Sequence, residues 1–185
     1  MIFFRSYLIK NICSFIMVLP PVVFKFLRKG YRKEMKHFSE DFSELVAVIP
    51  QYGDLGNACT LWFPEDERIV GLRAMTVMEH LFYDSLVNLQ ASVEYYGNLL
   101  NLRRNVPLVL DEDRIFLPVK VRKPLFKNDG AYGFVRLDMV ASVKDYQVEL
   151  FDGRSFSSLM KAPMLRQILS RGMMLETVVS RSLPL

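Results

Sequence analysis

The residue types that most often carry enzyme chemistry are scarce in this chain of 185 residues. It has two histidines and two cysteines, and neither His80 nor Cys59 stands at a metal-ligand or nucleophile–base spacing from the others. The acidic residues Asp111 and Asp113 fall in a segment typical of a turn, and turn geometry explains them. Phosphate-binding glycine loops, GxSxG, HExxH and EF-hand patterns are absent from the sequence. We therefore expect no enzyme, no catalytic site, no metal and no cofactor.

The charged residues are distributed unevenly, which points to ionic binding instead of catalysis. The net charge is +4, but residues 1–34 alone contribute seven basic residues and one acidic residue. The remainder alternates in sign, with −7 over residues 35–98, +4 over 99–127, −3 over 128–153 and +4 over 154–185. Two interpretations stay open: the basic stretches are ordinary solvated surface, or they form a local contact surface for a polyanion.

The N-terminal segment differs from the rest of the chain. Its uncharged run from Asn11 to Phe24 is shorter than the roughly 20 residues that span a bilayer, and two prolines interrupt it. We predict that residues 1–34 lie outside the fold and that residues 35–185 form the domain. A translation start at Met35, a membrane-facing segment and an additional packed helix remain alternatives. The two cysteines suit a reducing compartment, so we expect a cytoplasmic protein.

Short apolar runs separated by turn residues predict an α+β fold: a β-rich single domain of short antiparallel strands and hairpins with a C-terminal helix. We expect turns at Asp111–Arg114 and at the two-residue pair Asp152-Gly153. We expect a helix capped by Asp84 that ends near Gly97, and another that begins near Pro163, with Gly172 as a break or cap. The predicted strands are Leu45–Ile49, Thr60–Phe63, Leu108–Leu110, Ile115–Val121, Phe134–Val143 and Gln147–Phe151.

Four short segments occur in an order that matches a known family. Ser92–Arg104 reads SVEYYGNLLNLRR, with an arginine six positions after the glycine, and Val109–Pro118 reads VLDEDRIFLP. Tyr132–Val135 is an aromatic-glycine-aromatic segment, and Val148–Phe156 reads VELFDGRSF. Over about residues 75–170 the set resembles ComK, the bacterial competence transcription factor. ComK-type proteins bind paired AT-rich boxes, largely through the minor groove, as oligomers, and activate genes for DNA uptake. The resemblance therefore implies a DNA-binding activator that forms a homo-oligomer.

The residues allow such a function, because arginine and lysine bind the narrow minor groove of AT-rich DNA favourably. On a strand, Lys120 and Arg122 would share one face, opposite Lys123. Phosphate contacts from these residues would make binding salt-sensitive. The candidate DNA-binding residues are Arg103, Arg104, Lys120, Arg122, Lys123, Lys127, Asn98 and Asn101.

Two alternatives to this prediction stay open. The basic residues can be plain strand-edge charges that prevent aggregation. The chain can also be a non-enzymatic interaction domain, associated with a membrane through residues 1–34.

Overall fold

The described part of the chain is built around a six-stranded antiparallel sheet. The computed structural model describes residues 41–53, 56–126 and 129–181. The chain divides after Ser39 into two units, and all described residues belong to the second. The prediction for residues 1–34 therefore lies outside the described residues.

The strands of the larger sheet follow the order β3-β2-β1-β6-β5-β4. Val48 of β1 pairs with Phe134 of β6, and Leu117 of β5 pairs with Val135 of β6. Strand β6 thus joins the N-terminal strands to the strands that follow the helices. The bounds are β1 Ala47–Gly53, β2 Gly56–Trp62, β3 Glu67–Val70, β4 Leu108–Val109, β5 Ile115–Lys120 and β6 Tyr132–Arg136.

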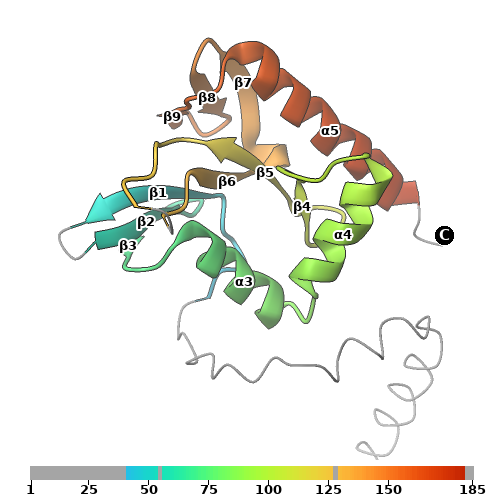
Figure 1. The fold of residues 1–185 in the computed structure, drawn as a ribbon, viewed down its shortest axis with the longest axis horizontal. Helices are drawn as coiled ribbons and strands as arrows, with labels where there is room; N and C mark the ends of the chain where they lie inside the picture. Colours follow the sequence, from blue (N-terminus) through green and yellow to red (C-terminus); the bar gives the residue numbers. More distant parts are fainter. Residues whose placement is uncertain (1–40, 54–55, 127–128, 182–185) are drawn as a thin grey trace, which may run out of the picture. The chain divides into compact units, whose positions relative to one another are not determined.

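A second sheet, of order β7-β8-β9, packs with the C-terminal helix α5 on one side of the larger sheet, while α3 lies on the other side (Figure 1). The rings of Trp62 and Phe156 meet edge to face across the two sheets, with centroids 5.9 Å apart. Residues 115–119 of β5 are all buried, because both faces of that strand are covered. The bounds are β7 Val140–Lys144, β8 Gln147–Leu150, β9 Ser155–Ser157, α3 Ala74–Asp84, α4 Leu89–Leu99 and α5 Ala162–Arg181.

The architecture is the predicted one: an α+β fold of short antiparallel strands with a C-terminal helix. Both predicted hairpins are present, between β4 and β5 and between β8 and β9. In the second, the Leu150 N–H donates to the Arg154 carbonyl at 2.9 Å, and this bond encloses three residues, 151–153, instead of the predicted two. Gly153 supplies the left-handed conformation there, with φ of 86°.

The predicted helix that starts at Asp84 is wrong, because two helices meet near that point. Asp84 ends α3, and α4 begins after Asn88, whose Oδ1 accepts a hydrogen bond from the Ala91 N–H at 2.9 Å. Leu86 stands between the helices in the left-handed region, with φ of 58°, and the Val87 N–H donates back to the Phe82 carbonyl at 2.9 Å. This backbone reversal ends α3. Asn88, and not Asp84, therefore caps the N-terminus of α4.

Three other predicted boundaries also differ. Phe134–Val143 is not one strand, because the 3₁₀ turn Leu137–Met139 (η1) separates β6 from β7, which belong to different sheets. Pro50 does not end the first strand, because β1 continues to Gly53. The proline lies beyond Val48, the last residue of β1 that pairs with β6, so its missing N–H removes no hydrogen bond between these strands. Gly172 neither breaks nor caps α5. Its missing side chain lets the helix approach Leu117, since a Cβ there would lie 2.6 Å from the Leu117 Cδ2.

Candidate nucleic-acid interface

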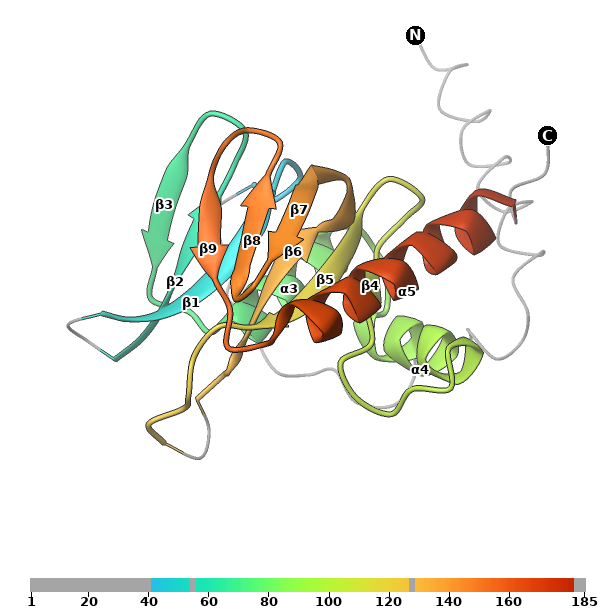
Figure 2. The same cartoon turned by 90° about the horizontal axis from the view of Figure 1, so that it is seen from above.

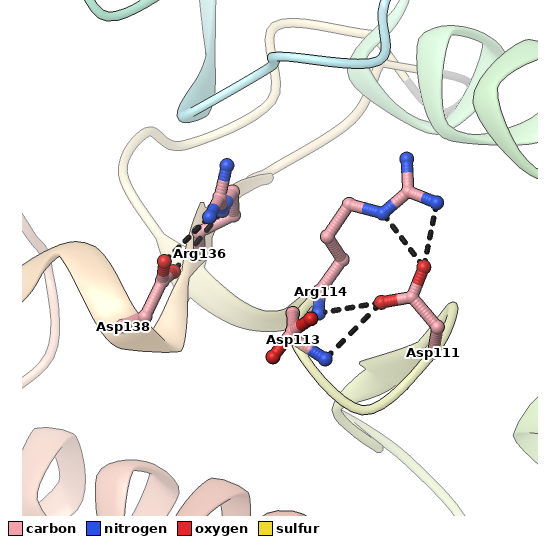
Figure 3. Close-up of polar contacts among 5 residues, drawn as sticks. All are labelled: Asp111, Asp113, Arg114, Arg136 and Asp138. Atoms are coloured by element: carbon pink, nitrogen blue, oxygen red, sulfur yellow. Dashed lines mark hydrogen bonds and ion pairs between the residues drawn. The ribbon is translucent and has the colours of Figure 1, made fainter.

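One basic residue of the segment 99–127, Arg114, is paired with a carboxylate in the β4–β5 turn. In the β4–β5 turn, Asp111 Oδ1 accepts the N–H groups of Asp113 and Arg114 at 3.2 and 2.8 Å, and the Arg114 Nε donates to Asp111 Oδ2 at 2.7 Å (Figure 3). The carboxylate therefore forms the predicted turn and pairs with Arg114. In the same view, Arg136 pairs with Asp138 across the turn that follows β6, with 3.0 Å between Nε and Oδ1.

Arg122 is held by the fold on three sides. Its Nη1 donates to the Gln51 carbonyl at 2.7 Å, its Nε to the Gly130 carbonyl at 2.7 Å, and its Nη2 to the Asn57 Oδ1 at 2.6 Å. The guanidinium also lies over the Tyr52 ring, 4.1 Å from its centroid. It thus connects β1 and β2 with the β5–β6 connection, residues 121–131. The guanidinium is thus engaged within the fold and is not presented for contact with a partner.

The network around Arg122 continues through Asp129. Asn57 Nδ2 donates to Asp129 Oδ1 at 2.6 Å, and the Tyr52 hydroxyl donates to Asp129 Oδ2 at 2.8 Å. These hydrogen bonds, from Asn57 first and Tyr52 second, hold the pKa of the Asp129 carboxyl below its usual value. The carboxylate is therefore ionised at neutral pH and fixes the β5–β6 connection against the β1–β2 hairpin.

The remaining basic candidates are accessible. Arg103, Arg104 and Lys123 are exposed and Lys120 is half-buried. Within the described part of the chain, no carboxylate lies within ion-pair distance of these four side chains. Lys127 lies outside the described residues.

The four side chains fall into two groups. Arg103 and Arg104 follow α4 in the connection to β4, whereas Lys120 and Lys123 lie at the end of β5 and beyond it. The two groups are separated along the sheet. The first connection enters the sheet at Leu108, which pairs with Phe116 of β5. Lys120 lies four residues further along β5, a distance of roughly 13 Å. Both connections extend on the lower side of the view in Figure 2. The predicted alternation through Lys123 is wrong, because β5 ends at Lys120.

Most of the family-like segment Ser92–Arg104 has a structural explanation. The Ser92 hydroxyl donates to the Val109 carbonyl at 2.8 Å, which ties α4 to β4. The Leu102 N–H donates to the Gly97 carbonyl at 2.7 Å, and Asn101 is left-handed with φ of 53°, so the helix ends in a Schellman motif. A Cβ on Gly97 would lie 2.9 Å from the Leu102 carbonyl oxygen. This helix end positions Arg103 and Arg104 at the surface, and Asn98 is exposed on the last turn of α4.

The left-handed backbone of Asn101 allows its role in the fold to be tested apart from its role in binding. Asn101→Ala is expected to lower the free energy of unfolding by about 1 kcal/mol, because alanine tolerates that conformation poorly. Asn101→Gly is expected to keep the wild-type stability within about 0.5 kcal/mol, because glycine adopts the conformation freely. Urea denaturation, followed by the fluorescence of the single tryptophan Trp62, measures both. Equal losses for the two variants would contradict this role.

The sequence did not predict the side chains that organise the β5–β6 connection or the exposed apolar side chains in its middle. Tyr52 and Asn57 are far from Arg122 in the sequence, and Asp129 lies in the turn that follows it. Only the fold brings these side chains together. Leu125 and Phe126 are exposed in the same connection. The sequence does carry an indication of them, since two large apolar residues precede the turn-forming residues Asn128-Asp129-Gly130.

No family model, curated protein or solved structure matches this chain. Among the described residues, no group of three or more histidine, cysteine or acidic side chains is arranged to hold a metal ion. The described helices include none that is both long enough and apolar enough to cross a membrane. Cys59 is buried, and burial raises the pKa of its thiol to about 12. At neutral pH it is therefore a protonated core residue and not a nucleophile.

Proposed function

We propose that this chain is a cytoplasmic, ComK-like transcription regulator that binds AT-rich double-stranded DNA, forms a homo-oligomer and activates competence genes. The observation that supports DNA binding is the placement of four basic side chains, on two connections and at the end of β5, in an otherwise acidic body. Among the described residues, no carboxylate pairs with these side chains, which are Arg103, Arg104, Lys120 and Lys123. Backbone hydrogen bonds fix the helix end that precedes Arg103, and side-chain hydrogen bonds anchor the backbone of the β5–β6 connection, so both connections start from defined positions. The ordered resemblance of four segments to ComK supports the regulatory role.

The two groups suit different tasks on DNA. Arg103 and Arg104 are adjacent, exposed and next to the amides of Asn98 and Asn101, a combination that can read a groove. Lys123 is an exposed ammonium on the second connection and suits a phosphate contact, which sets orientation without reading sequence. Oligomerisation would bring two such surfaces to paired boxes.

The test is fluorescence anisotropy with a labelled AT-rich duplex at several salt concentrations. Replacing Arg103 and Arg104 together with alanine is expected to weaken binding by about 2 kcal/mol, because each arginine loses groove or phosphate contacts. Replacing Lys123 with alanine is expected to weaken binding to all sequences alike and to reduce the salt slope by about one.

A matched control removes the same charge elsewhere. Arg68 and Lys144 are exposed and paired with Asp66 and Glu149, and their double replacement by alanine is expected to leave the affinity within about twofold. If the wild-type chain shows no salt-dependent binding to any duplex, the DNA-binding proposal fails. If both double variants weaken binding equally, the interface is not at Arg103 and Arg104.

A further inference from the structure

Two large apolar side chains lie in the middle of the β5–β6 connection instead of in a core. Leu125 and Phe126 are 70% and 72% exposed. Figure 2 shows the connection extending beyond the end of β5, away from the sheets. Turns at such places ordinarily carry glycine, asparagine, aspartate or serine. Adjacent apolar side chains held in solvent are typical of a contact site.

The backbone beneath these side chains is fixed. The Leu125 N–H donates to the Tyr52 hydroxyl oxygen at 2.8 Å, and the Phe126 N–H donates to Asp129 Oδ2 at 2.9 Å. The Asp129 N–H returns a bond to the Phe126 carbonyl at 3.1 Å. A loose loop could fold both side chains back onto the protein, but this backbone is anchored to β1 through Tyr52. The side chains are therefore presented outward before any partner arrives, which lowers the entropy cost of binding.

Two lysines precede the apolar pair in the chain. Lys123 is exposed two residues before Leu125, and Lys120 ends the preceding strand. The acidic residue of the connection, Asp129, is ionised, and the positive charge of Arg122 in the same network opposes its negative charge. An apolar pair close in the chain to the exposed ammonium group of Lys123 complements a partner that offers an apolar slot between anionic groups. The base stack of a duplex between its phosphates is such a partner.

We propose that Phe126, supported by Leu125, inserts between two stacked base pairs of the bound duplex. This inference rests on the proposed DNA-binding function and adds where and how the DNA is deformed. Proteins that bind the minor groove insert phenylalanine or leucine side chains between base pairs, which partly unstacks and kinks the duplex. Pyrimidine–purine steps such as TA unstack most easily. Insertion therefore favours AT-rich DNA that contains TA steps over AT-rich DNA that lacks them.

The test compares two duplexes of equal charge and base composition. Alternating poly(dA-dT) contains TA steps, whereas the paired homopolymers poly(dA) and poly(dT) contain none. The wild-type chain is expected to bind the alternating duplex on the order of tenfold more tightly, in line with the energy of base–aromatic contacts. Phe126→Ala is expected to bring that ratio close to one, and Phe126→Leu to retain most of it. With 2-aminopurine at a TA step, wild-type binding is expected to raise the fluorescence by unstacking, and Phe126→Ala to abolish the rise.

Phe151 provides the matched control, because it is also 72% exposed but lies in the β8–β9 connection. Phe151→Ala is expected to keep the wild-type ratio and the fluorescence rise. If the wild-type chain binds both duplexes in a salt-dependent way and Phe126→Ala changes neither readout, insertion is wrong while the DNA-binding proposal stands. If the wild-type chain binds neither duplex, both proposals fail. If Phe126→Ala abolishes flotation with anionic phosphatidylserine vesicles but leaves DNA binding unchanged, the tip contacts lipid and insertion is wrong.

Discussion

Replacing Arg122 with methionine is expected to lower the free energy of unfolding by about 3 kcal/mol. The guanidinium donates charge-assisted hydrogen bonds to the Gln51 and Gly130 carbonyls and to Asn57, and a hydrogen bond to a charged group contributes about 1.5–3 kcal/mol net. Because Arg122 is only half-buried, water replaces part of the lost bonding, so the expected loss is less than the sum of three such bonds. Methionine fills a similar apolar volume but donates nothing, so three acceptors lose their partner. The contact between the guanidinium and the Tyr52 ring is lost as well.

Urea denaturation measured by Trp62 fluorescence gives the loss, and Arg122→Lys refines it. Lysine keeps the charge but cannot reach three acceptors in one plane, so an intermediate loss is expected. Arg103→Met is the control, because Arg103 is exposed in a surface connection, and a change within about 0.5 kcal/mol is expected. Similar small losses for Arg122→Met and Arg103→Met would show that Arg122 does not hold the fold.

The role of Arg122 also illustrates what the sequence could not predict. Its partners Gln51 and Asn57 are 71 and 65 positions away, so only the pairing of β1 with β6 and of β6 with β5 brings them together. In the sequence, Arg122 is one of several basic residues close together, and composition alone cannot separate the one whose side chain is bonded within the fold from those that are exposed. The position of Lys120 and Lys123 in the same segment was predictable, but their separation from Arg103 and Arg104 depends on the strand register.

Local turn chemistry, in contrast, was predictable. Asp111 accepts the backbone N–H groups of its own turn, and Gly153 adopts a left-handed conformation, so each hairpin is specified within a few residues. The start of α5 near Pro163 is local in the same sense. The cap of α4 was not predictable, since Asp84 and Asn88 are both good cap residues, and the packing of α3 decides between them.

Gly133→Ala is expected to lower the free energy of unfolding by about 3 kcal/mol, at the upper end of the usual cost of an added methyl group in a packed interior. A Cβ at Gly133 would lie 2.7 Å from the Val48 carbonyl oxygen and 3.1 Å from the Pro50 Cδ. The Val48 oxygen belongs to the backbone of β1, which pairs with β2 on its other side, so it cannot move away as a flexible side chain would. The methyl group must therefore push β6 away from β1.

Gly130→Ala is the matched control for this prediction, because a Cβ there meets nothing within 4 Å and the residue precedes the same strand. Its expected change is within about 0.5 kcal/mol, with a small gain from the reduced freedom of the unfolded chain. Urea denaturation of both variants by Trp62 fluorescence and far-ultraviolet circular dichroism measures the difference. Equal stability of the two variants would mean that β6 tolerates a side chain at Gly133. The expected difference would instead explain the glycine of the family-like segment Tyr132–Val135 by the close approach of two strands, without any contact to DNA.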